Sequence, residues 1–96
     1  PNRNSQRKSP DLKDDQHKEK LLVYPNPAQH RITIESPFDE NTVSIIEIFD
    51  ITGKRVLSLS AIGNVIEIDV SLMNKGYYVI RLFSENTALS SSFIIN

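Results

Sequence analysis

The sequence predicts an all-β fold, an immunoglobulin-like antiparallel β-sandwich of about seven strands that follows a disordered N-terminal linker. Three observations support this prediction. From Leu21 onward, β-branched and aromatic residues alternate with polar ones, which is typical of half-buried strands. Short turn sequences interrupt the alternation at spacings of roughly 8 to 12 residues, as in two-sheet sandwiches. Residues 1–20 contain one large apolar residue, Leu12, and so have nothing to bury against a core.

The chain therefore divides into two parts. Residues 1–20 are expected to form a flexible linker, and residues 21–96 a single β-sandwich domain. His17 lies close to Asp14 and Asp15 in the linker, but an isolated solvated histidine is far commoner than a metal ligand. We therefore expect no metal site there.

Seven segments of the domain carry the alternating pattern. They are residues 21–24, 30–36, 42–50, 55–60, 65–69, 77–83 and 88–95. In the third segment, Val43 and Ile45 fall on one side of the strand, and Ile46 and Ile48 on the other. The apolar side thus changes midway, so we expect either a β-bulge near Ile45 and Ile46 or burial on both faces.

Turn sequences separate these strands. Asp50 and Gly53 delimit a short hairpin loop, since aspartate initiates turns and glycine accepts a positive φ. Gly63 lies in a second hairpin turn, and Gly76 is expected to supply a third turn with a conformation that a side chain would penalise. The prolines on both sides of Asn26 prevent the first strand from continuing directly into the second.

Composition excludes several classes of function. A chain of 96 residues forms one small domain, which leaves little room for a catalytic cleft, so an enzyme is disfavoured. The absence of cysteine excludes disulfides, thiolate nucleophiles and Cys-ligated metals. With 11 basic and 12 acidic residues, the chain lacks the basic stripe that nucleic-acid binding requires. The apolar runs are far shorter than the roughly 20 residues of a membrane helix.

No set of residues forms a recognisable catalytic or metal site. His30 is the one histidine of the domain, and no Gly-x-Ser-x-Gly sequence is present. Asp39 and Glu40 are interpreted as solvated loop carboxylates, because no calcium-loop spacing surrounds them. We therefore predict no catalytic residue, no metal and no cofactor. Aromatic residues on strands fill cores more often than they bind sugars, and this applies to the three tyrosines of the domain: Tyr24, Tyr77 and Tyr78.

Several local motifs, taken in order, point to a known family. They are Tyr24-Pro25-Asn26-Pro27, Asp50-Ile51-Thr52-Gly53 and Gly76-Tyr77-Tyr78. In this order and spacing, residues 21–96 resemble the type A C-terminal sorting domain of the type IX secretion system, which is found on cell-surface and secreted proteins of the Bacteroidota. The alternative that remains open is an immunoglobulin-like adhesion or carbohydrate-binding accessory module.

The resemblance implies a β-sandwich without an activity of its own that serves as a secretion signal. An attached cargo protein would cross the inner membrane with a signal peptide and fold in the periplasm. It would then pass an outer-membrane translocon with the help of an outer-membrane shuttle protein, and reach the cell surface or the medium. A sortase-like peptidase would remove the domain by cleavage within or next to the linker that ends at Lys20.

The resemblance also places the recognition signal toward the C-terminus, where the last strand would offer its backbone, its side chains or an exposed edge to the translocon. The residues expected to carry it are Leu89, Phe93, Ile94, Ile95 and Asn96. Family members usually have a basic residue shortly before the terminal apolar pair, whereas this chain has none after Arg81. A signal without that charge is either weaker or is read through shape and strand pairing alone.

Overall fold

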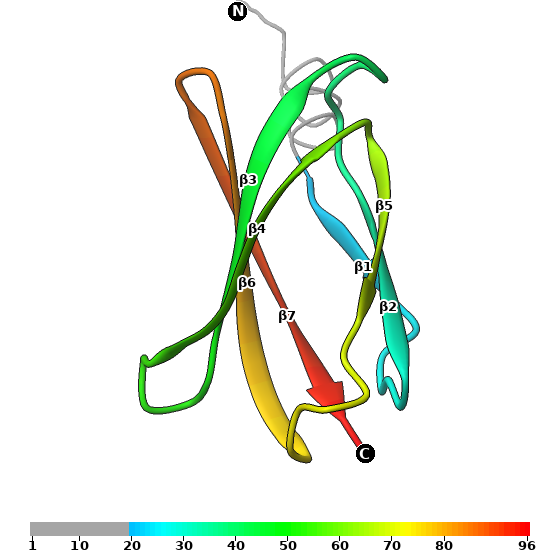
Figure 1. The fold of residues 1–96 in the computed structure, drawn as a ribbon, viewed down its shortest axis with the longest axis vertical. Helices are drawn as coiled ribbons and strands as arrows, with labels where there is room; N and C mark the ends of the chain where they lie inside the picture. The colour runs from blue at the N-terminus through cyan, green and yellow to red at the C-terminus, as the bar shows by residue number, and fades with distance from the viewer. Residues whose placement is uncertain (1–19) are drawn as a thin grey trace, which may run out of the picture.

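Two antiparallel sheets face each other in the structure, a computed structural model that describes residues 20–96 (Figure 1). The three-stranded sheet has the order β1–β2–β5, with β1 at Leu22–Tyr24, β2 at Arg31–Glu35 and β5 at Val65–Asp69. The four-stranded sheet has the order β4–β3–β6–β7. Its strands are β3 at Val43–Phe49, β4 at Arg55–Ile62, β6 at Gly76–Ser84 and β7 at Thr87–Ile95.

The predicted all-β fold of seven strands is therefore confirmed, and each strand overlaps the segment that predicted it. The alternation of apolar and polar residues predicted the strands correctly because each sheet buries one face. Every second residue of a strand therefore points into the sandwich. The linker prediction and His17 lie outside the described residues, apart from Lys20. No helix within residues 20–96 has the length and apolar character needed to cross a membrane.

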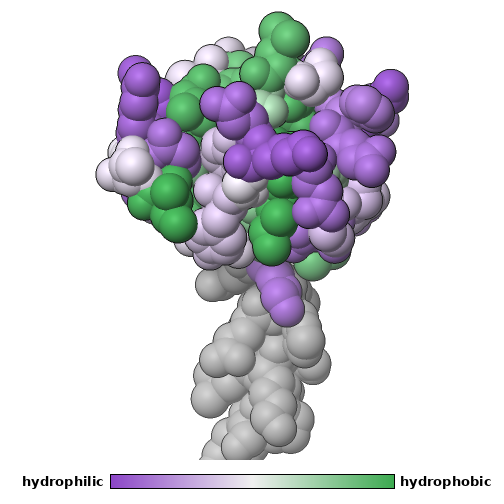
Figure 2. Space-filling model, turned by 90° about the horizontal axis from the view of Figure 1, so that it is seen from below, coloured by the Kyte–Doolittle hydropathy of each residue, from purple (hydrophilic) through white to green (hydrophobic). Residues whose placement is uncertain are grey.

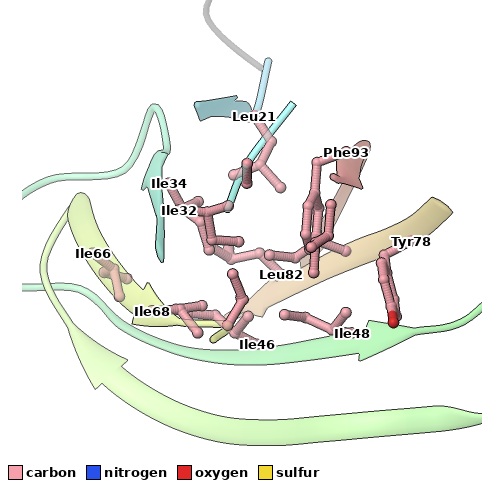
Figure 3. Close-up of a cluster of buried hydrophobic side chains, with 14 residues drawn as sticks. Leu21, Ile32, Ile34, Ile46, Ile48, Ile66, Ile68, Tyr78, Leu82 and Phe93 are labelled. Atoms are coloured by element: carbon pink, nitrogen blue, oxygen red, sulfur yellow. The ribbon is translucent and has the colours of Figure 1, made fainter. Parts of the chain in front are cut away.

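The hydrophobic core lies between the two sheets (Figure 3). The three-stranded sheet contributes two isoleucines from each of two strands, which face residues of three strands on the other sheet. The side chains that meet here are Ile32 and Ile34 of β2, Ile66 and Ile68 of β5, Ile46 and Ile48 of β3, Ile80 and Leu82 of β6, and Phe93 and Ile95 of β7. The fold is thus stabilised by branched aliphatic packing and strand pairing.

The prediction for the middle of β3 is wrong. Its pairing with β4 stays in register through Ile45 and Ile46, and the one shift falls between Ile48 and Phe49, next to the hairpin turn. Ile46 and Ile48 are fully buried, whereas Val43 is 58% and Ile45 is 49% exposed. Since β3 alternates regularly, Val43 and Ile45 lie on the outer face of the sheet.

Outward apolar residues of β3 find partners on neighbouring strands of the same face. Val43 is paired in register with Ile62 of β4, and Ile45 with Phe83 of β6. Cross-strand pairs of this kind stabilise a sheet even where the face is open to solvent. This pairing explains the apolar residues on the outer side of β3. From the sequence of the strand alone, they had suggested a β-bulge or burial on both faces.

Candidate functional site at the C-terminal strand

β7 is an edge strand of the four-stranded sheet and pairs with β6 along its whole length. Its side chains alternate between the core and the outer face. Phe93 is fully buried, Ile95 is 4% exposed, and Leu89 packs partly buried against the core. Ile94, in contrast, is 42% exposed, and Asn96 is also at the surface. Of the five residues expected to carry recognition, a partner of the folded domain therefore reaches Ile94 and Asn96 most readily.

Phe93 is held in the core by an aromatic neighbour on β6. The ring of Tyr78 stacks on the ring of Phe93, with centroids 5.6 Å apart and an angle of 21° between the planes. The Tyr78 hydroxyl donates a hydrogen bond of 2.7 Å to the backbone oxygen of Asn74, four residues upstream. This bond resembles the tyrosine corner of immunoglobulin-like domains. Tyr78 thus packs at the corner between β5 and β6, while Tyr77 points to the outer face.

The Tyr24-Pro25-Asn26-Pro27 motif lies directly beside the end of β7. The Ile94 N–H donates to Asn26 Oδ1 at 3.0 Å, and the Ala28 N–H donates to the Ile94 oxygen at 2.7 Å. The Asn96 N–H donates to the Ala28 oxygen at 2.9 Å. Ala28 and Ile95 thereby form a parallel bridge. Three hydrogen bonds therefore join the segment from Asn26 to Ala28 to the end of the last strand, far away in the sequence.

The two prolines explain how the chain reaches β7. β1 pairs with β2 in the three-stranded sheet, and the chain then crosses to the edge of the other sheet at Ala28. Proline has no N–H to donate and cannot continue a ladder. The side chain of Asn26 supplies an acceptor in their place. The bonds made by Asn26 and Ala28 were not predicted from the sequence, although an asparagine between two prolines is a detectable signal.

Seen from the end of the molecule that holds the β3–β4 turn and the C-terminus, apolar side chains are interspersed with polar ones (Figure 2). On this face, small apolar areas alternate with polar groups. Within the described residues, the apolar side chains on this face are therefore scattered and form no broad patch.

The β3–β4 turn is organised by the carboxylate of Asp50. Asp50 Oδ1 accepts hydrogen bonds from the Thr52 hydroxyl at 2.6 Å, the Thr52 N–H at 2.9 Å and the Lys54 N–H at 3.1 Å. The Thr52 hydroxyl bond is the main reason why the pKa of Asp50 is lowered. Asp69 makes the same arrangement with the hydroxyl and N–H of Ser71, and its pKa is also lowered, mainly by the hydroxyl bond.

Because the pKa values of Asp50 and Asp69 are lowered in the folded domain, we expect the domain to lose stability in acid. A carboxyl group with a lowered folded-state pKa stabilises the fold fully above its unfolded value, near 3.8, and this contribution is lost as the pH falls toward the folded value. We expect the thermal midpoint, followed by circular dichroism, to fall below about pH 4. The fall should be shallower in the double variant Asp50→Asn, Asp69→Asn. Equal acid profiles for the two proteins would contradict this assignment.

Gly53 closes the same turn with a φ of +90°, and no atom lies within 4 Å of a Cβ placed there. Gly53→Ala should therefore cost about 1–2 kcal/mol through backbone strain alone, because an L-residue disfavours this conformation. Chemical denaturation measures the loss. Lys54→Ala, a change in the same exposed turn, should leave the midpoint nearly unchanged. Equal midpoints for the two variants would show that the turn tolerates a side chain.

The remaining polar candidates are dispersed. Asp39 Oδ1 accepts bonds from the Asn41 N–H at 2.9 Å and the Thr42 hydroxyl at 3.0 Å, so this carboxylate organises its own loop. His30 is exposed just before β2. Within residues 20–96, no three histidine, aspartate or glutamate side chains are grouped to hold a metal ion.

The three tyrosines lie on different surfaces. Tyr24 of the three-stranded sheet donates to Glu35, and this hydrogen bond is the main reason why its pKa is raised. Tyr77 is on the outer face of the four-stranded sheet, and Tyr78 is buried between the sheets. The three rings therefore do not share one surface and do not form a common sugar-binding platform.

Comparison with solved structures identifies the fold. A DUF3244 family protein from Bacteroides vulgatus, with an immunoglobulin-like β-sandwich fold, superposes with a TM-score of 0.62 at 15% sequence identity, over 77% of this chain and 81% of the other. PorZ, an essential surface component of the type IX secretion system of Porphyromonas gingivalis, superposes with a TM-score of 0.61 at 17% identity. That match covers 79% of this chain and 11% of PorZ. The predicted immunoglobulin-like sandwich is thus confirmed.

Sequence comparison identifies the family. No curated protein sequence matches the chain significantly. A family model described as a secretion system C-terminal sorting domain matches residues 22–96. The match begins at the first residue of β1 and includes all seven strands. The chain therefore belongs to the family of C-terminal sorting domains of the type IX secretion system.

Proposed function

We propose that this domain directs an attached cargo protein, fused upstream in the same chain, across the outer membrane through the type IX translocon. The cargo passes through the periplasm and ends at the cell surface or in the medium. The family match over residues 22–96 is the observation that carries this proposal. The domain acts by binding, with no catalytic role, and its partners are the translocon and an outer-membrane shuttle protein.

The proposal includes removal of the domain by a sortase-like peptidase after export. Cleavage would fall within or next to the linker that ends at Lys20. Lys20 is exposed, whereas Leu21 is only 4% exposed and packs in the core. A peptidase needs an extended, accessible segment, so a cut before Leu21 leaves the sandwich whole. Mass spectrometry of the exported cargo would locate its new C-terminus, and a terminus after residue 21 would contradict this placement.

Recognition is proposed to use the folded domain at the end of β7. Ile94 and Asn96 are accessible there, and Asn26 and Ala28 hold this end of the strand in place. Phe93 and Ile95 contribute indirectly, because their burial fixes the direction in which Ile94 points. Leu89 lies nearer the middle of β7 and packs partly against the core.

The test is a fusion of residues 1–96 to a periplasm-targeted fluorescent protein. It is expressed in a host with a working type IX system and in a matched strain without the translocon. We expect the reporter at the surface or in the medium of the first strain and in the periplasm of the second. Ala substitutions at His30 and Asp39 should not change export. Retention of the reporter in both strains would refute the proposal.

A further inference from the structure

The outer edge of β7 carries a row of backbone groups that point away from β6. In an antiparallel pair, the N–H and C=O of one residue point to the same side, and successive residues alternate. The N–H and C=O of Ile94 both bond to the segment around Ala28, away from β6. By the same alternation, the backbone groups of Ala88, Ser90 and Ser92 also point away from β6.

Most of this edge has no strand hydrogen-bonded to it, although β1 of the other sheet lies close to β7. Within residues 20–96, the ladder along the outer edge of β7 consists of the bridge between Ala28 and Ile95. The chain before Ala28 belongs to the other sheet, because β1 pairs with β2. Within residues 20–96, no segment is therefore paired with positions 88–92 of β7, whereas Ala28 is paired with the end of the same edge.

This open edge lacks the usual protection against a further strand. Edge strands are commonly guarded by charged residues or proline, yet residues 87–95 contain neither. The side chains on the outer face are the small ones of Ala88, Ser90 and Ser92, while Leu89 on the inner face is only partly buried.

The other edges of the sandwich differ from it. β5 carries Glu67 and Asp69, and β1 is three residues long and is followed by Pro25. β4 is long and nearly uncharged, but no segment of residues 20–96 pairs with its outer edge. Within residues 20–96, β7 is thus the edge strand whose outer side is paired at one end, with Ala28, and unpaired along the rest.

We propose that positions 88–92 of β7 accept an extended segment of a partner polypeptide as a fifth strand of the four-stranded sheet. This inference rests on the proposed function, and the partner is a protein of the export machinery. The segment is uncharged and free of proline at its centre. It places an apolar side chain beside Leu89 and small or polar side chains beside Ser90 and Ser92. Backbone hydrogen bonds supply the affinity, and the alternating side chains supply the selectivity.

A matched pair of proline substitutions tests this edge. The Ser90 N–H points outward, so Ser90→Pro keeps the bonds to β6 and removes a donor from the edge. Ser60→Pro is the control on β4. The backbone groups of Thr42 and Asp50 bond to the chain on the β4 side. Because backbone groups alternate in direction along the paired strands, those of Leu59 and Ala61 point toward β3. The backbone groups of Ser60 therefore point away from β3, toward solvent. Both serines are exposed. If either proline variant fails to fold by circular dichroism, the pair Ser90→Lys and Ser60→Lys replaces it.

Export of the fluorescent fusion of residues 1–96 is the readout. We expect the Ser60 variant to be exported like the parent and the Ser90 variant to lose export. Export of both variants at the parental level would overturn this inference while the parent's export upholds the proposed function. Retention of the parent itself would instead refute the proposed function, and this inference with it.

Hydrogen exchange of the purified 96-residue chain identifies other occupants of the edge. We expect the amides of Ser90 and Ser92 to exchange rapidly, and those of Ser91 and Phe93, which point toward β6, to be protected. Protection of Ser90 at all protein concentrations would place a segment of this chain on the edge. Protection that grows with concentration would place a second copy there. Either result would overturn the assignment to a partner strand.

Discussion

Phe93→Ala should lower the free energy of unfolding by about 3–5 kcal/mol, the usual cost of removing a fully buried phenylalanine. Phe93 is 0% exposed and stacks on Tyr78, so the substitution leaves a cavity and an unpartnered ring. Small domains have total stabilities near the lower end of about 5–15 kcal/mol. The variant should therefore be largely unfolded or close to it, as measured by chemical denaturation.

The control for this prediction is the next residue of the strand. Ile94 is 42% exposed on the outer face, so Ile94→Ala should change stability by only about 0.5 kcal/mol or less. Equal losses in the two variants would contradict the alternation of β7 between core and surface.

Deletion of residues 93–96 should abolish export of an attached reporter. The deletion removes Phe93 and Ile95 from the core and takes away the groups that bond to Asn26 and Ala28. The residues proposed to carry recognition, Ile94 and Asn96, are lost at the same time. The measurement is the fraction of reporter outside the outer membrane, and export at the parental level would contradict the placement of the signal.

A second variant separates unfolding from loss of recognition. Ile94→Ser combined with Asn96→Ala changes two surface side chains and keeps the buried residues of β7. We expect a folded domain by circular dichroism, with reduced export. Full export by this variant would show that these two side chains are not read.

The strands were predictable because each depends on a local property. Ile32 and Ile34, for example, alternate with polar residues and are both fully buried. The turn at Asp50 and Gly53 was also predictable, since the hydrogen bonds of Asp50 reach no farther than Lys54.

Features that depend on distant segments were not predictable in this way. Val43 looks like a core residue until its neighbour Ile62 on β4 is known. Whether Tyr77 or Tyr78 is the packed ring depends on which side of β6 faces the core. The bond from Ile94 to Asn26 joins residues 68 positions apart, which local pattern does not reveal.

The strand that holds the candidate site was predicted correctly, but which of its side chains reach the surface could not be defined from the sequence. Phe93, Ile94 and Ile95 form one apolar run in the sequence, whereas the structure separates them into two buried residues and one exposed residue. Which of them a partner can touch follows from the pairing of β7 with β6.

We propose that the sandwich, and not the linker, is the export signal. The most direct measurement compares two fluorescent reporters in a host with a working type IX system, one carrying residues 1–96 and one carrying residues 1–20 alone. We expect the first reporter to reach the surface or the medium and the second to stay in the periplasm. Export of the reporter that carries residues 1–20 alone, or retention of both reporters, would contradict it.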